Sequence, residues 1–250
     1  MEVLEFLAAF EPRSALAVIL AAAIVLYAVS ANLAWLSHTP RGGRLGRLLG
    51  WGQHSRVASF AGELARWLYY LGVPWGTLML GYNTMRALGV WGMDWFAPAP
   101  VFLALTLGAA AAIFWVWRPY VQVEHPHAID ESGWNWARHM VEIVYQEAHW
   151  AFYRSGPILW LGDNAYWGSL FGLMLVLLEG VSNPQVRAHW RDVTRADAPL
   201  WSGSLAIIST LIFIYTQNAW YCLLVHLVLD QGLRGLIGFP RAHAGHLLRD

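Results

Sequence analysis

The chain has 250 residues, of which 57% are hydrophobic and only 13% are charged, whereas a soluble globular domain carries roughly 25% charged residues. The apolar residues form several blocks of about 20 residues, the length that a helix needs to cross a lipid bilayer. This composition predicts an integral membrane protein. The 16 basic residues are all arginines interspersed among 16 acids, which argues against a nucleic-acid partner. Cys222 is the single cysteine, so an internal disulfide framework and a cysteine-based zinc site are excluded.

The apolar blocks predict seven membrane-spanning helices. The first, 14–36, follows an acidic rather than a basic opening, which indicates a retained anchor and not a cleaved signal peptide. The others cover about 57–79, 98–117, 134–153, 166–181, 200–215 and 219–237. Asn218 is a plausible helix N-cap at the start of the last segment. We therefore expect an all-α, polytopic transmembrane bundle that forms one domain over residues 1–250.

Arginines are unevenly distributed among the predicted loops, and short arginine-rich loops face the cytoplasm. The arginine-rich parts are the loop after the first segment (Arg41, Arg44, Arg47, Arg56), the loop after the fifth (Arg187, Arg191, Arg195) and the tail (Arg241, Arg249). The alternate loops hold only Arg13, Arg86 and Arg154. This asymmetry predicts an N-terminus outside and a cytoplasmic C-terminus. The location that we expect is the bacterial cytoplasmic (inner) membrane.

The fourth segment, 134–153, is too polar to face lipid. Its polar side chains step by three or four residues, which places them on one helical face: Asn135, His139, Glu142, Gln146, His149 and Tyr153. Ionisable groups at membrane depth are costly unless they are paired, so such a stripe is a functional-site hypothesis. The alternative is a hydrogen-bonded network that holds the segment against its neighbours. In either case we expect the stripe to be buried and to face His226.

Two further pairs of polar residues have helical spacing. Glu147 and Arg154 are seven residues apart and share a face, so either they form an ion pair or Arg154 extends to the membrane interface. His226 and Asp230 lie four apart in the seventh segment. A carboxylate one turn from a histidine can orient its ring for metal binding or proton transfer, although Arg234 is an alternative partner for Asp230.

The run from Thr216 to Trp220, followed by His226 and Asp230, resembles the last signature of the CAAX protease and bacteriocin-processing family of intramembrane proteases. The stretch 86–90 is also similar to a segment upstream of that family's core, which would here cover about 85–240. The departures fall in the other two signatures. Gln146-Glu147 stands where the family has two glutamates, Ala151 replaces an arginine, and Leu175 replaces a histidine four residues after Phe171.

The resemblance implies an intramembrane peptidase in which glutamates and histidines activate water and stabilise the oxyanion. Only Glu147, His226 and Asp230 match residue by residue, with His149 as a replacement for the missing histidine. Because glutamine cannot act as a base and leucine cannot bind a metal, we favour a non-proteolytic relative, a subunit or assembly factor of a larger membrane complex. The alternative is an active peptidase that uses these four residues, with a divalent metal possible between the fourth and seventh segments.

The sequence contains 16 tryptophans, more than two interfacial belts require. Trp150, Trp160 and Trp220 lie where they can pack against another subunit, a pigment or a quinone. We do not expect a haem or pigment, because His149 and His226 lack a recognised binding pattern. Residues 124–131 combine histidines with acids in a loop, which is either a metal site or a solvated turn.

Overall fold

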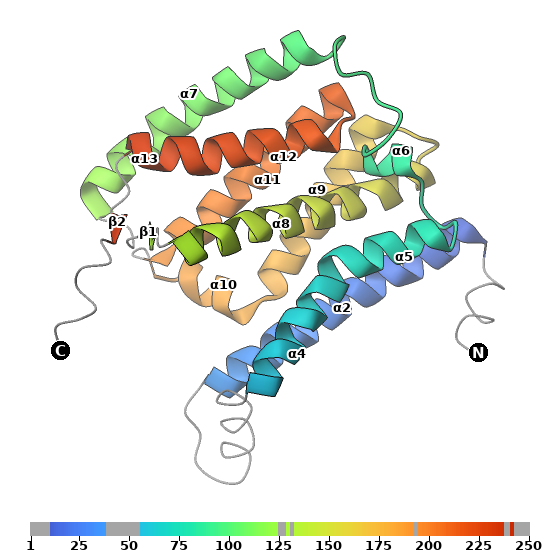
Figure 1. Cartoon of the computed structure of the whole chain (residues 1–250), viewed down its shortest axis with the longest axis horizontal. Helices are drawn as coiled ribbons and strands as arrows, with labels where there is room; N and C mark the ends of the chain where they lie inside the picture. The colour runs from blue at the N-terminus through green and yellow to red at the C-terminus, as the bar shows by residue number, and fades with distance from the viewer. Residues whose placement is uncertain are drawn as a thin grey trace, which may run out of the picture.

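The computed structural model describes residues 11–38, 56–124, 129–130, 133–192, 195–237 and 241–242. These residues are almost entirely helical (Figure 1). The long helices are α2 (Pro12–His38), α7 (Ala99–Glu124), α8 (Gly133–Trp160), α9 (Ala165–Ser182) and α11 (Asp197–Thr216). The shorter ones are α4 (Arg56–Trp67), α5 (Val73–Met79), α6 (Met85–Leu88), α10 (Pro184–Trp190), α12 (Ala219–Leu227) and α13 (Arg234–Ile237). Two π-helical turns, η1 (Leu68–Gly72) and η3 (Val228–Leu233), join α4 to α5 and α12 to α13. Strands β1 (Ile129–Asp130) and β2 (Arg241–Ala242) pair in parallel.

Within the described residues, four helices are long and apolar enough to cross a membrane. Their spans are Pro12–Ser37, Ala99–Gln122, Ala165–Ser182 and Asp197–Thr216. On α7 the side chains of Leu107 and Trp115 are 70% and 76% exposed, an apolar surface that suits lipid rather than water. The prediction of an all-α membrane protein is therefore confirmed at this level.

The other three predicted crossings are also helical, but they are less uniform. One is built from α4, η1 and α5, and another from α12, η3 and α13, so a π-helical turn interrupts each. The third is α8, which carries several ionisable residues. The count of seven crossings stays a prediction.

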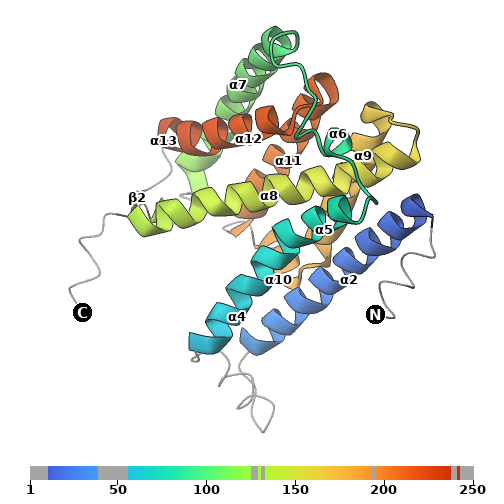
Figure 2. The same ribbon diagram turned by 45° about the vertical axis from the view of Figure 1, so that its right-hand side comes forward.

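Consecutive long segments run in alternate directions between two ends of the molecule (Figures 1 and 2). At one end, the indole Nε1 of Trp160 donates a hydrogen bond to the carbonyl of Arg13, over 3.1 Å. At the other end, Nδ2 of Asn32, late in α2, lies 3.3 Å from the carbonyl of Ser182, the last residue of α9. The start of α2 therefore lies beside the end of α8, and the C-terminal part of α2 lies beside the end of α9.

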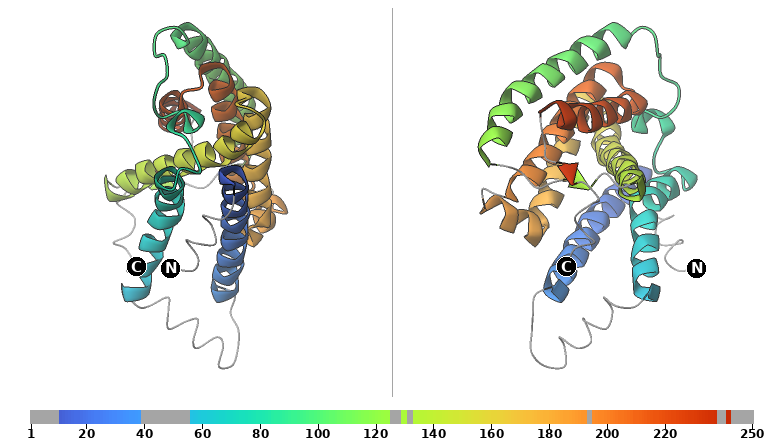
Figure 3. Two further views of the ribbon diagram at one scale, coloured as in Figure 1. Left: turned by 90° about the vertical axis from the view of Figure 1, so that its right-hand side faces the viewer. Right: turned by 60° about the vertical axis from the view of Figure 1, so that its left-hand side comes forward.

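Helix α8 lies in the middle of the bundle, between the α12–α13 segment and the pair formed by α2 and α4–α5 (Figure 3). Two glycines let α9 approach it closely. A Cβ added at Gly172 would stand 2.6 Å from the Cα of Arg154, and one at Gly168 would stand 2.6 Å from the Cα of Ile158. Such small residues allow membrane helices to pack backbone against backbone. This packing holds the C-terminal half of α8 rigidly against α9.

The start of α12 is capped as predicted. The side-chain oxygen of Asn218 accepts hydrogen bonds from the backbone N–H groups of Trp220 and Tyr221, at 2.9 and 3.3 Å. Gln217, just before it, adopts the left-handed conformation (φ 49°) that ends α11. The tight connection fixes where α12 leaves α11, and so where His226 lies, in the last turn of α12.

Candidate functional site

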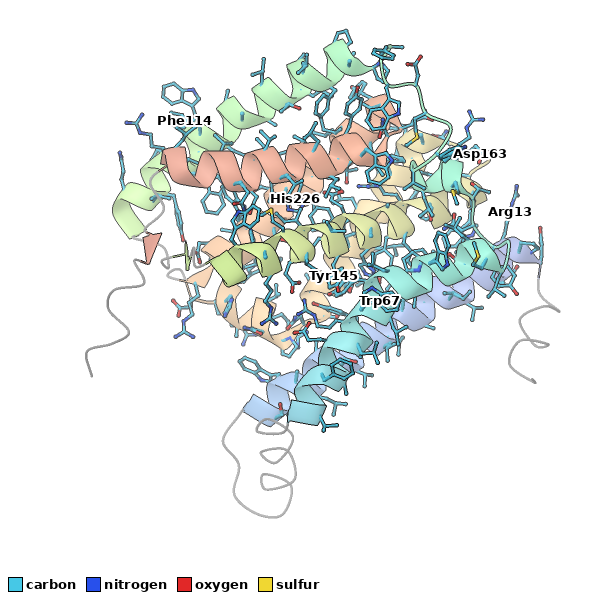
Figure 4. All side chains as sticks on the ribbon, in the orientation of Figure 1. Arg13, Trp67, Phe114, Tyr145, Asp163 and His226 are labelled. Atoms are coloured by element: carbon cyan, nitrogen blue, oxygen red, sulfur yellow. The ribbon has the colours of Figure 1, made fainter. Side chains whose placement is uncertain are left out.

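Every acid, arginine and histidine of α8 contacts a side chain on another helical element. At its N-terminal half, Arg138 pairs with Glu63, His139 with Asp230, and Glu142 with Arg66. Further along, the contacts are Glu147 with His226, His149 with Glu179, and Arg154 with Ser209. Figure 4 shows side chains filling the space around α8, with His226 above it. Ionisable residues whose exposure to lipid would cost free energy therefore make contacts between helices instead.

The most buried of these contacts form a cluster around Glu147. Nδ1 of His226 lies 2.9 Å from Glu147 Oε1, and Ser209 Oγ donates to Glu147 Oε2 over 2.8 Å. Arg154 Nη1 donates to Ser209 Oγ over 3.1 Å, and Arg154 Nη2 lies 3.8 Å from Glu147 Oε2. These four residues are between 0% and 4% exposed. The carboxylate and the guanidinium therefore offset each other's charge inside the bundle, with Ser209 between them.

Aromatic rings enclose this cluster. Trp150 stacks on the His226 ring, with centroids 5.3 Å apart and planes 11° apart. The guanidinium carbon of Arg154 lies 4.7 Å from the centre of the Phe213 ring, a cation–π contact. Of the two alternatives for Arg154, the ion pair with Glu147 is confirmed and extension to the membrane interface is wrong. A buried guanidinium lowers its desolvation cost by such contacts.

Asp230 does not act as the sequence spacing suggested. Trp201 Nε1 donates to Asp230 Oδ1 over 2.8 Å, and His139 Nε2 contacts Oδ2. The carboxylate at hydrogen-bonding distance from His226 is that of Glu147, so the predicted orientation of His226 by Asp230 is wrong. The physical reason is the π-helical turn η3, in which Asp230 lies. Its i→i+5 hydrogen bonds depart from the 3.6-residue period on which the prediction relied.

The predicted polar stripe is buried only in part, and it is divided among several neighbours. His139 contacts η3, Glu142 contacts α4, and His149 and Tyr153 face η1 and α9. The expectation that the whole stripe faces His226 is wrong, because Glu147 and Trp150, on the adjacent face, make that contact. The side chain of Asn135 lies outside the described residues, as does that of Arg234, and Gln146 lines a cavity beside Glu179.

A second buried cluster surrounds Glu179, a residue that the sequence analysis missed. His149 Nε2 lies 2.8 Å from Glu179 Oε2, and Tyr69 donates to Glu179 Oε1 over 3.1 Å. The hydroxyl of Tyr153 lies 3.3 Å from that of Tyr69. The signal was present, because Glu179 is the one acid in the apolar stretch 166–181. His149 is therefore engaged with Glu179, and the structure shows no contact of it with Glu147 or His226 among the described residues.

The described residues contain no group of three or more His, Cys, Asp and Glu side chains placed to hold a metal ion. Between the fourth and seventh predicted segments, Glu147 with His226 and His139 with Asp230 each provide two ligand groups, whereas a catalytic zinc site has three protein ligands. The donor set between the fourth and seventh predicted segments therefore does not fit the divalent metal considered above. The histidine-containing loop at 124–131 falls largely outside the described residues.

Chemically, Glu147 and His226 form a carboxylate–imidazole pair that can hold and exchange a proton. Both carboxylate oxygens are already engaged by protein groups, His226 on one side and Ser209 on the other. No protein-family model matches the chain, and no curated protein or solved structure matches it either. The similarity to intramembrane proteases stays a prediction carried by the sequence motif.

Proposed function

We propose that this chain is a non-proteolytic membrane protein, a subunit or assembly factor of a larger membrane complex built on a CAAX-protease-like helical core. The observation that carries this proposal is the complete pairing of the ionisable residues of α8 with α4, α9, α11, α12 and η3. Because an unpaired charge at membrane depth costs a few kcal/mol or more, each pair ties α8 to one neighbour. In this proposal the side chains of α8 hold the surrounding helices together at the centre of the bundle.

The environment of Glu147 supports a structural role. A general base must accept a proton from water, yet both carboxylate oxygens of Glu147 already lie at hydrogen-bonding distance from protein groups, and the side chain is 5% exposed. The family's other reactive positions are occupied by Gln146, Ala151 and Leu175, none of which can supply a carboxylate, a guanidinium or an imidazole. In this proposal the contact between Glu147 and His226 holds α8 against α12 and carries out no catalysis.

The proposal includes seven crossings of the bacterial inner membrane, with the N-terminus outside and the C-terminus cytoplasmic. The alternating direction of consecutive helices supports this arrangement (Figure 1). Arg187 and Arg191 lie on or next to α10, which packs against both α2 and α9 at one end of the bundle. Arg13 and Asp163 lie at the opposite end (Figure 4). The arginine-rich end is the one that we assign to the cytoplasm.

In this proposal a partner subunit packs against an apolar groove on the surface of the bundle. A mainly apolar groove of about 600 Å³ lies between η1–α5 and α8, and Leu88, Ala148 and Trp220 line it. Trp75, also in its lining, is 56% exposed, and Trp220 is 47% exposed. Exposed tryptophans beside an apolar groove are typical of contact surfaces between proteins.

One observation favours a second candidate function, an active intramembrane peptidase. The sequence motif predicted that Glu147 and His226 belong to one site, and they lie in contact. In this alternative, Glu147 releases Ser209 and acts as the base, and His226 polarises the peptide carbonyl. Asp230 and His149, engaged elsewhere, would play no direct part.

A proteolysis assay distinguishes the two functions. The protein purified in a mild detergent is incubated with a panel of membrane-spanning and prenylated peptides, alongside Glu147→Gln and His226→Ala. Glu63→Gln is the matched control, because Glu63 makes an exposed ion pair. We expect no cleavage by any of them and stoichiometric co-purification of another membrane protein. Cleavage by the wild type and the control that both site variants abolish would overturn the proposal and establish the peptidase.

A further inference from the structure

A surface cavity of about 460 Å³ lies where two of the apolar helices end. Val101, near the start of α7, and Thr216, the last residue of α11, both line it. Both helices are long and apolar enough to cross the membrane, so the end that they share lies at the depth of the lipid head groups. Figures 1 and 2 show the loop between α6 and α7 passing beside the connection between α11 and α12 at this end.

Exposed aromatic side chains in the loop between α6 and α7 support this depth. Trp91 is 74% exposed, Trp95 47% and Phe96 89%. Tryptophan concentrates at membrane interfaces, because its ring is apolar and its N–H group needs a polar partner. The loop that forms part of the cavity wall therefore has the composition of a segment in contact with head groups.

This loop is held in place by the start of α12. Trp220 Nε1 donates a hydrogen bond to the carbonyl of Val90 over 3.1 Å, and the hydroxyl of Tyr221 donates to the carbonyl of Trp95. These two contacts fix the chain on both sides of Asp94. The cavity wall is thus formed before any ligand arrives.

The cavity contains one cation and one anion that do not pair. Arg86 and Asp94 both line it, and both are exposed. Among the described residues, neither forms an ion pair with the other or with a third group. Asp94 Oδ1 accepts hydrogen bonds from the backbone N–H groups of residues 96 and 97, at 2.8 and 3.1 Å. These bonds hold the carboxylate in place, and Oδ2 has no partner among the described residues.

A ligand that carries both charges suits this pair. An anion alone would be attracted by Arg86 and repelled by Asp94, and a cation alone would experience the opposite. Attraction between charges acts over about 8 Å at physiological ionic strength, so a zwitterion in the cavity experiences both residues without having to contact each directly. A primary ammonium can in addition donate a hydrogen bond to a carboxylate, which a quaternary ammonium cannot.

We propose that this cavity binds the head group of a phospholipid that carries a primary ammonium, with the phosphate toward Arg86 and the ammonium toward Asp94. A lipid is favoured over a soluble zwitterion because Val101, in the cavity wall, belongs to a candidate membrane span and is 42% exposed. Apolar surface for the acyl chains therefore begins at the cavity. The site is independent of the peptidase motif and of the partner subunit.

The test measures lipid preference by native mass spectrometry of the full-length protein in detergent. The probes are phosphatidylethanolamine and phosphatidylglycerol with identical acyl chains, offered in equal amounts; the second has the phosphate and lacks the ammonium. Asp94→Asn removes the charge that attracts the ammonium. We expect the ratio of bound phosphatidylethanolamine to bound phosphatidylglycerol to fall by about 2- to 5-fold in this variant, the effect of one exposed charge contact. An unchanged ratio would overturn the proposal.

Asp163→Asn is the matched control. Asp163 is an exposed acid between α8 and α9, and it lines a neighbouring cavity to which Arg86 also contributes, but not this one. We expect its substitution to leave the lipid ratio unchanged. A fall as large as that in Asp94→Asn would show a general effect of surface charge and refute the site.

Two further measurements address the phosphate and the lipid. Arg86→Gln should weaken the binding of both lipids, because both carry the phosphate; unchanged binding of both would refute the site. Glycerophosphoethanolamine has the same head group and no acyl chains. In about 10-fold excess it should leave phosphatidylethanolamine bound to the wild type, because the acyl chains supply most of the affinity of a lipid. Displacement of the lipid would overturn its assignment as the ligand and indicate a site for a soluble zwitterion.

Discussion

Replacing Arg154 by methionine removes the buried cation beside Glu147 while keeping much of the side-chain volume. The guanidinium is 1% exposed; it donates to Ser209 over 3.1 Å and lies 3.8 Å from the Glu147 carboxylate. It also covers the Phe213 ring at 4.7 Å. Breaking a buried ion pair by removing one partner costs about 3–5 kcal/mol, because the other charge stays buried without compensation. A charge-assisted hydrogen bond to a neutral group accounts for about 1.5–3 kcal/mol of this. We therefore expect the free energy of unfolding of Arg154→Met to fall by about 3 kcal/mol or more.

Reversible unfolding in mixed micelles, followed by circular dichroism as the denaturing detergent increases, measures this loss. Glu147→Gln and the double variant complete a mutant cycle. Once Glu147 is neutral, no orphaned charge remains, so the double variant should be less destabilised than the two single changes added together, by at least 1 kcal/mol. Strict additivity, or a loss below about 1 kcal/mol in Arg154→Met, would refute the electrostatic explanation of this cluster.

Two further predictions concern packing and pH. Gly172→Leu should prevent normal folding, because its Cβ would stand 2.6 Å from the Cα of Arg154. Gly180→Ala lies on the same helix, where a Cβ meets nothing within 4 Å, so this control should fold normally. Size-exclusion chromatography measures the yield of monodisperse protein for both variants. Equal yields of Gly172→Leu and Gly180→Ala would contradict the close approach of α8 and α9. Asp94 accepts hydrogen bonds from the backbone N–H groups of residues 97 and 96, which lower the pKa of its carboxyl below the ordinary value. Since the folded pKa is the lower one, its stabilising contribution is present above the ordinary Asp pKa and is lost as the pH falls through the folded value. An NMR titration of the carboxyl carbon checks the direction, and a midpoint at or above the ordinary value would contradict it.

The positions of the helices were largely predictable. Apolar blocks long enough to span a membrane coincide with α2, α7, α9 and α11, because burial in lipid demands a run of apolar side chains whatever the tertiary fold. The pairing of Glu147 with Arg154 was also accessible, since both residues belong to one helix with known periodicity. Local geometry was sufficient for these features.

The partners on other helices were not predictable in the same way. Which helix faces His149 depends on how α8 and α9 pack, and no spacing within the fourth segment reveals Glu179. Ser209 looked like one small residue in an apolar span, yet it links Arg154 to Glu147. Asp230 was misassigned because a uniform helix was assumed through a π-helical turn.

The two π-helical turns make the bundle sensitive to chain length at specific points. Tyr69 lies in η1 and Asp230 lies in η3, so in both places a widened turn presents the side chain that reaches the polar residues of α8. Deleting one residue from either turn would restore ordinary helix, so Tyr69 or Asp230 would no longer project from a widened turn toward α8. The lipid-facing surface would still be apolar enough for insertion, but the polar groups of α8 would lose their counterparts. Such a deletion would yield a chain that enters the membrane and then fails to assemble its interior.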